Sequence, residues 1–168
     1  MSLPPLTPLA TAVLEVGTPE RLLEFECGDG EATLFLSREF PRARVRGVDP
    51  SERLVRAAQG RVGLDPEGRV AFKVGRAGSL PFPADNFDLV AGLDANPSAA
   101  EIARVLRPGG HLILARTSGS TPFPGLSGWL ARRRLERHGI ELTEPVGVGD
   151  GSFSVGRLRR GETAAAAV

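Results

Sequence analysis

The 168-residue sequence has a single cysteine, Cys27, a single tryptophan, Trp129, and no tyrosine. One cysteine excludes an internal disulfide and a cysteine-based zinc site, so we expect no metal ion. The scarcity of Trp and Tyr argues against an aromatic surface that stacks nucleic-acid bases. The net charge of +1 gives no overall attraction to a polyanion. We therefore expect no nucleic-acid partner.

Long hydrophobic runs are also missing. No apolar run approaches the roughly 18 residues that span a membrane. The N-terminal sequence MSLPPLTPLA lacks the basic start and the apolar stretch of a signal peptide. We therefore expect a cytoplasmic protein with no membrane partner. The length predicts a single domain over 1–168, with a helical segment within 1–19 and a disordered tail at 160–168.

Apolar runs alternate with amphipathic segments, and Gly and Pro lie between them. The apolar runs predict strands at 21–25, 43–48, 69–74, 86–93 and 111–116. Helical spacing predicts helices at 6–16, 31–40, 51–61, 97–106 and 126–139. The end of the chain predicts a hairpin around VGVGDG. This order predicts an α/β fold with a Rossmann-like doubly wound sheet, mostly parallel, with an antiparallel C-terminal hairpin strand.

Three stretches fall at the carboxyl ends of predicted strands, where such sheets bind ligands. The glycine turn 26–30 follows the first strand and opens a helix, so its backbone can approach a ligand closely. Asp49 ends the second strand, where a carboxylate can accept both hydroxyls of a ribose. The stretch GRAGSLPFPADNFDLV, residues 75–90, joins the third strand to the fourth.

The stretches LLEFECGDGEAT, VRGVDPS, SLPFPADNFDLV and EIARVLRPGGHLIL follow one another over roughly residues 20–116. In this order they resemble the class I S-adenosylmethionine-dependent methyltransferases, with domains of the methyltransferase type 11 kind. The resemblance implies S-adenosylmethionine as the cofactor and a small molecule as the methyl acceptor. The methyl group would pass in line from the sulfonium to a nucleophile, mainly through positioning.

The resemblance also implies a role for each matched residue. The first turn would face the methionine part of the cofactor through Glu24, Glu26, Cys27, Gly28 and Gly30. The ribose and adenine would lie against Asp49, Pro50, Arg76 and Ala77. The sulfonium would lie beside Gly92 and Leu93, and Asp94 would orient or deprotonate the acceptor.

Structural interpretations stay open for several of these residues. Glu24 could pair with an arginine, and Asp49 could cap the helix that follows it. Cys27 is more typical of a small filler than of a nucleophile. We expect LPFP to pack a loop and RPGG to turn a helix into a strand, with no chemistry of their own.

Two residues depart from the family pattern. Glu26 stands where the family has a glycine, and its carboxylate could repel the cofactor's carboxylate or attract its amino group. Arg76 stands where an acidic residue accepts the adenine amino hydrogens, and arginine has only donors. Arg76 could instead pair with Asp49. The two changes predict weak or absent cofactor binding.

These departures leave two principal functions open. One is a methyltransferase, and the other is a pseudoenzyme with the same fold that acts as a binding or partner subunit. A dinucleotide-binding domain fits less well, because the turn lacks the third small residue of that motif. A homodimer is compatible with the sequence, since a second subunit could cover the open crevice.

The predicted helix 126–139 carries four arginines, at 132–134 and 137. We expect Trp129, Leu130 and Leu135 to face the sheet and the arginines to face solvent. A patch for nucleic acid or an acidic partner is the alternative interpretation.

Overall fold

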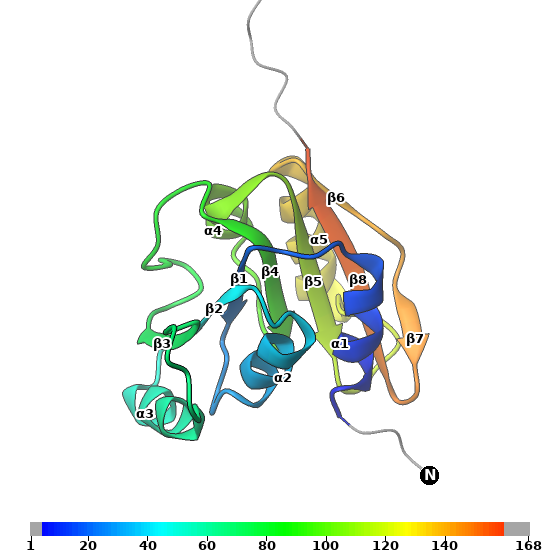
Figure 1. Cartoon of the computed structure of the whole chain (residues 1–168). Helices are drawn as coiled ribbons and strands as arrows, with labels where there is room; N and C mark the ends of the chain where they lie inside the picture. The colour runs from blue at the N-terminus through cyan, green and yellow to red at the C-terminus, as the bar shows by residue number, and fades with distance from the viewer. Residues whose placement is uncertain (1–4, 160–168) are drawn as a thin grey trace, which may run out of the picture.

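A computed structural model describes residues 5–159 and contains one eight-stranded sheet between two layers of helices (Figure 1). The strand order is β3-β2-β1-β4-β5-β8-β6, and β7 pairs with β8. The strands are β1 (Arg21–Phe25), β2 (Arg44–Asp49), β3 (Val70–Val74), β4 (Phe87–Leu93), β5 (Leu106–Arg116), β6 (Ile140–Leu142), β7 (Val146–Val148) and β8 (Gly151–Leu158).

The strands β1 to β5 pair in parallel, and β8 runs antiparallel to β5, β6 and β7. The predicted doubly wound sheet with an antiparallel C-terminal hairpin strand is confirmed. The strand order reverses between β1 and β4, which lie side by side. Ligands of open α/β sheets bind at such a reversal, beyond the carboxyl ends of the strands.

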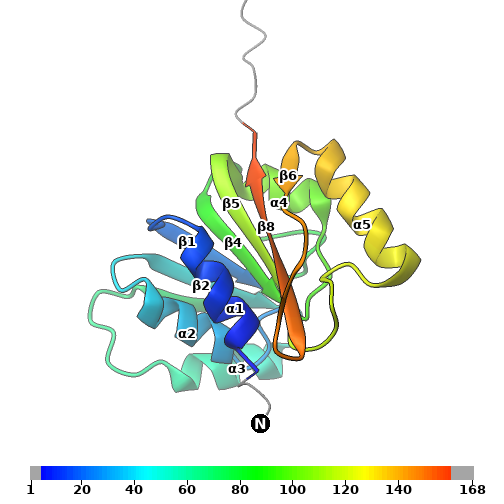
Figure 2. The same cartoon turned by 90° about the vertical axis from the view of Figure 1, so that its right-hand side faces the viewer.

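Helices cover both faces of the sheet (Figures 1 and 2). One face carries α1 (Thr7–Ala12) with the 3-10 turn η1 (Val13–Glu15) and α2 (Glu31–Glu39). The other face carries α4 (Ala99–Val105) and α5 (Gly125–Arg137). The helix α3 (Glu52–Arg61) packs against β2 and β3 at one edge.

The period of two in each strand divides the core between these faces. In β1, Leu22 packs with α1 and α2, whereas Leu23 and Phe25 pack with α4. In β5, Ile113 faces the first layer, and its neighbours Leu112 and Leu114 face the second. Apolar side chains on both faces are typical of parallel strands covered on both sides.

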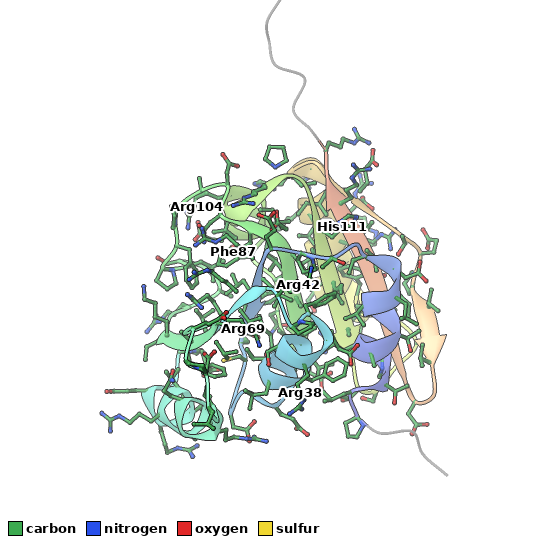
Figure 3. All side chains as sticks on the ribbon, viewed as in Figure 1. Arg38, Arg42, Arg69, Phe87, Arg104 and His111 are labelled. Atoms are coloured by element: carbon green, nitrogen blue, oxygen red, sulfur yellow. The ribbon has the colours of Figure 1, made fainter. Side chains whose placement is uncertain are left out.

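The LPFP and ARVL motifs contact each other on the α4 side of the sheet, where Figure 3 labels Arg104 and Phe87. Arg104 donates from its guanidinium to the carbonyl oxygens of Leu80 and Phe82 at 3.0 and 2.8 Å. Glu101 accepts from the backbone N–H of Leu80 at 2.7 Å and is paired with Arg104. The ring of Phe82 packs edge-on against Phe87, with centroids 5.0 Å apart. The prediction that LPFP packs a loop is confirmed.

Local signals fix several element ends. Ser51 caps α3, and its hydroxyl accepts from the N–H of Leu54 at 3.3 Å. Gly139 follows α5 with φ +85°, as a left-handed C-terminal stop requires. Within residues 5–159, no helix is both long and apolar enough to cross a membrane.

Three details differ from the sequence-based expectations. The strand β5 begins at Leu106, so residues 107–110, which were expected to form a turn, lie within the strand. The strand is irregular there: Gly109 has φ +83°, and the pairing with β4 shifts register. The VGV of the expected hairpin loop forms β7. Trp129 is 54% exposed, because α5 faces the core through Leu135. The expected tail at 160–168 lies outside the described residues.

Candidate functional site

The strand order reverses between β1 and β4, and sheets of this kind bind ligands beyond the strand ends at such a reversal. We call this region, which is bordered by the turn 26–30, the end of β2 and the loop after β4, the crevice. The turn leaves β1 with three residues in the left-handed region: Glu26 at φ +50°, Gly28 at +57° and Gly30 at +86°. Gly30 is also crowded, since a Cβ there would lie 2.7 Å from the Phe72 ring. A Cβ on Gly28 would meet nothing within 4 Å, so the turn is open to a ligand at that position. Glu26 therefore keeps the backbone shape that a glycine would adopt.

The Glu26 side chain bridges the two strands at the reversal. Its Oε2 accepts from the backbone N–H of Asn96 at 3.0 Å, and Asn96 lies in the loop after β4. The bond joins the turn after β1 to a segment 70 residues away in sequence. The carboxylate is thus held across the place where a ligand of this fold binds.

Asp49 organises the floor of the crevice. It is 7% exposed, and its two carboxylate oxygens accept from the N–H groups of Gly28 at 3.0 Å and Ser51 at 2.9 Å. The suggested Asp49–Arg76 pair is wrong, because within residues 5–159 Arg76 makes no ion pair and its side chain is exposed. Each oxygen of Asp49 has a further lone pair available, so two hydroxyl donors can still be accepted.

Glu24 lies beneath the turn and is 2% exposed. Thr33, in the first turns of α2, donates its hydroxyl hydrogen to Glu24 Oε1. Burial raises the pKa of Glu24 from 4.5 to about 8, and the nearby charges of Asp49 and Asp29 add to the rise. The group is therefore protonated at neutral pH, which makes it a hydrogen-bond donor as well as an acceptor. Its partner is a threonine and not the arginine considered above.

Cys27 is a buried thiol that donates weakly to the carbonyl of Gly28 at 3.7 Å. Burial raises its pKa to about 12, and the charges of Glu24 and Asp49 act in the same direction. Since the thiolate is the nucleophilic form, this cysteine is unreactive at neutral pH. The structure supports its interpretation as a filler.

The opposite end of the crevice is looser. Arg76 forms one isolated backbone bridge with Ser79, and its side chain points into solvent. Ala77 is half-buried against the α4-side core, and Pro50 is exposed beside the start of α3. Position 76 therefore supplies no acceptor for the adenine amino group that the family resemblance would place there.

The carboxylate of Asp94 lies just after the end of β4 and binds Thr117. Asp94, at φ +52°, accepts from the N–H of Thr117 at 2.9 Å and from its hydroxyl at 2.8 Å. Asp94 thereby ties the end of β4 to the end of β5. Gly92 is required by the Phe25 ring, because a Cβ there would lie 2.4 Å from it. Leu93, the last residue of β4, is half-buried.

The sequence motifs did not identify Thr33, Thr117 or the backbone N–H of Asn96 as partners of these carboxylates. Thr33 lies nine residues after Glu24, on the helix that the turn opens, and this spacing was the available signal. The other two depend on contacts between neighbouring strand ends. No set of three or more His, Cys, Asp or Glu side chains in residues 5–159 could hold a metal ion.

A cavity of about 510 Å³ lies away from this crevice, between η1 and the strands β5 to β8. Its lining includes His111 (Figure 3), Glu15, Glu141 and Arg157. Burial, followed by the charge of Arg157, lowers the pKa of His111. The crevice remains the candidate site, because the strand-order reversal, the left-handed turn and the buried carboxylates coincide there.

Comparisons with known proteins identify the family and the fold. A family model described as a methyltransferase domain matches residues 22–110. The demethylmenaquinone methyltransferase of Lactococcus lactis is 34% identical over 108 residues, which are 60% of this chain and 43% of that protein. The ubiquinone/menaquinone biosynthesis C-methyltransferase UbiE of Syntrophotalea carbinolica is 34% identical over 128 residues, 71% of this chain and 54% of that protein. The chain spans about half the length of these relatives.

Solved structures match nearly the whole chain at low identity. A methyltransferase from Aquifex aeolicus aligns with a TM-score of 0.73 and 21% identity, covering 92% of this chain and 91% of that one. A chain of the Haloferax volcanii complex that contains the Trm112 methyltransferase activator aligns with a TM-score of 0.74 and 19% identity, covering 92% and 90%. These likenesses show the fold, and the family model covers more than half of the sequence. The chain belongs to the class I S-adenosylmethionine-dependent methyltransferase family.

Proposed function

We propose that this chain binds S-adenosylmethionine weakly in the β1/β4 crevice and transfers its methyl group to a small-molecule acceptor. The observation that carries the proposal is the turn after β1. Glu26, Gly28 and Gly30 all lie in the left-handed region, although Glu26 carries a side chain. Maintaining a non-glycine residue at φ +50° opposes a steric penalty of about 1 kcal/mol, so the turn shape is strongly determined by its surroundings.

The charge of the crevice fits one part of the cofactor and not another. Asp49 offers its free lone pairs to the ribose hydroxyls, and Gly28 leaves open space beside the turn. The acidic side chains Glu26 and Asp49 suit the sulfonium and the ammonium of the cofactor. The methionine carboxylate would meet Glu26, and like charges at close range in a partly dry site repel strongly. This mixture supports weak binding.

The bound cofactor supplies an electrophilic methyl group on sulfur, and the chain's contribution would be placement of the acceptor. Asp94 would orient the acceptor side of the crevice through its link to Thr117. Transfer to an acceptor that is already nucleophilic would then depend on proximity and alignment. The Lactococcus relative is named for demethylmenaquinone, which agrees with a small, lipophilic acceptor.

A non-catalytic binding or partner subunit is the second candidate. It is favoured by the Glu26–Asn96 bond, which fixes a carboxylate across the ligand position. The Haloferax neighbour comes from a complex with the Trm112 activator, so a protein partner is part of this alternative, as is a homodimer.

Incubation with S-adenosylmethionine and a panel of quinols, phenols and polyketide hydroxyls tests the proposal. We expect S-adenosylhomocysteine to form only with an acceptor present, and to disappear in Asp49→Ala. Folded Asp49→Ala protein, verified by circular dichroism, provides the control. If no acceptor yields product and equilibrium dialysis detects no cofactor binding at millimolar concentration, the partner-subunit function replaces this one.

A further inference from the structure

The helix α5 stands at the edge of the molecule, outside the sheet, and buries little of itself (Figure 2). Among its thirteen residues only Leu135 is fully buried, against α4 and β6. Leu126 is 73% exposed and Trp129 is 54% exposed, and both lie in the first half of the helix. Large apolar side chains that share one exposed helix face mark an interaction site more often than isolated ones do.

The exposed face combines these apolar side chains with arginines. Leu126, Trp129, Arg133 and Arg137 follow one another at spacings of three or four residues, so they lie on one side of the helix. We call these four residues the α5 outer surface. Leu135 lies on the opposite side of the helix, which places the outer surface away from the core.

No carboxylate of the described residues pairs with the basic charge of the outer surface. In residues 5–159 neither Arg133 nor Arg137 makes an ion pair with a carboxylate. The one acidic residue of α5, Glu136, is bound to Arg132 at 3.1 Å. The Arg133 guanidinium lies over the Trp129 ring, 5.7 Å from its centroid. The Arg133 cation is thereby held over the ring of an exposed aromatic side chain.

We propose that the α5 outer surface docks onto an anionic lipid bilayer. Leu126 and Trp129 would enter the boundary between headgroups and acyl chains, where an indole is well accommodated, and Arg133 and Arg137 would contact lipid phosphates. Surface-bound helices use Trp and Leu as apolar anchors and Arg as the basic residues, on opposite faces of the helix. In α5 the two kinds share one face, so the long arginine side chains would extend from it toward the lipid phosphates while Leu126 and Trp129 insert between the headgroups. The chain would lie on the bilayer, without the spanning segment whose absence led to the sequence-based expectation of no membrane partner. This inference is independent of methyl transfer.

The helix begins at the same edge of the sheet as the crevice. The loop 117–124 leaves the carboxyl end of β5, on the same edge of the sheet as the crevice, and leads directly into α5. Docking through the N-terminal half of α5 would therefore place that edge of the molecule near the bilayer.

Because Trp129 is the sole tryptophan and the chain has no tyrosine, its fluorescence reports on this surface alone. Vesicles with equal parts of phosphatidylcholine and phosphatidylglycerol should shift the emission to the blue, and brominated acyl chains should quench it. Phosphatidylcholine vesicles alone should give a much smaller change. Added salt should reverse the binding, since surface charges are screened.

Variants assign the effect to named side chains. Arg133→Gln with Arg137→Gln should weaken partitioning about 30-fold, which corresponds to about 1 kcal/mol for each basic residue near an anionic surface. Leu126→Ser should weaken it further while leaving the reporter in place. The exposed residues Leu64 and Arg42 supply matched controls, since Leu64→Ser and Arg42→Gln should leave partitioning unchanged.

Three outcomes would overturn the proposal. The first is an emission spectrum that anionic vesicles do not change. The second is a concentration-dependent dimer in sedimentation that Leu126→Ser converts to monomer, because the surface would then join two copies of the chain. The third is a larger emission change with a DNA or RNA oligonucleotide than with the vesicles.

Discussion

The two ends of the proposed cofactor site, which we call the methionine end and the adenine end after the parts of the cofactor that they would face, each carry one residue foreign to the family pattern, and the fold accommodates them differently. Glu26, at the methionine end, adopts a left-handed backbone and bonds to the N–H of Asn96. Arg76, at the adenine end, is exposed and without an acidic partner in the described chain. The first departure is built into the structure, and the second lies on its surface. Glu26 should therefore dominate the binding behaviour, and Arg76 should modify it.

The same contrast holds for the residues beneath each end. The methionine end rests on Glu24 and Thr33, which are fully buried. The adenine end rests on the loop 75–86, held from outside by Arg104. A buried ionisable group couples the methionine end to pH, whereas the adenine end depends on hydrogen bonds at the half-exposed surface.

The largest expected effect is the pH dependence that Glu24 imposes on stability. Its pKa rises from 4.5 in the unfolded chain to about 8 in the folded one, mainly through burial. The folded state binds more protons within this window, so the stabilisation is complete below pH 4.5 and is lost as pH rises to about 8. A difference of one in pKa between the folded and unfolded states corresponds to about 1.4 kcal/mol, so the pH-dependent part of the free energy of unfolding is on the order of a few kcal/mol.

Urea unfolding of Glu24→Gln at a series of pH values measures this effect. The variant keeps an acceptor for Thr33. Its free energy of unfolding should vary less than that of the wild type between pH 4.5 and about 8, the two pKa values of Glu24. The exposed Glu67→Gln should retain the wild-type profile. Parallel profiles for Glu24→Gln and the wild type would show that Glu24 ionises normally.

The next effect concerns the support of the adenine end. Arg104→Ala removes the donors to Leu80 and Phe82 and leaves Glu101 without its partner. We expect a loss of about 2 kcal/mol in unfolding free energy, or roughly 5 °C in Tm. Arg56→Ala, which breaks an exposed pair with Glu52, should change Tm by much less. Equal shifts for the two variants would contradict the anchoring role.

The smallest effect is expected at Arg76. Arg76→Asp supplies the acceptor that the adenine amino group lacks, and it should tighten S-adenosylhomocysteine binding about fivefold, or about 1 kcal/mol. Arg42→Asp, an equal change of charge on an exposed loop, serves as the control in the same calorimetric titration. Equal tightening in both variants would mean that the effect is one of net charge alone.

The sequence predicted the layout of the sheet because strand order and crevice position follow from local patterns and one topological rule. Apolar runs, Ser51 and Gly139 mark element ends within a few residues of where they occur. The motif order placed Glu24, Asp49 and Glu26 around one crevice for the same reason. The packing of LPFP was predicted, but its partner Arg104 was not, because the two segments become neighbours only in the folded chain.

What the sequence did not predict depends on contacts between distant segments. The Glu26–Asn96 and Asp94–Thr117 bonds join loops that become neighbours only when β1, β4 and β5 are paired. The expectation that Trp129 faces the sheet was wrong, because helical spacing alone does not say which side of an arginine-rich helix packs on the core. The exposure of Arg76, likewise, is set by the path of the loop 75–86.

We expect Glu26 to limit cofactor binding at the methionine end. The decisive measurement is a calorimetric titration of S-adenosylhomocysteine into the wild type, Glu26→Gly and Glu26→Gln. Relief of the left-handed strain and loss of the Asn96 bond oppose each other, so the glycine variant should remain folded. We predict tightening of at least tenfold, about 1.4 kcal/mol, in the glycine variant and a smaller gain in the glutamine variant, which removes the charge but keeps the volume. Micromolar binding by the wild type, or the same affinity in all three proteins, would contradict the account.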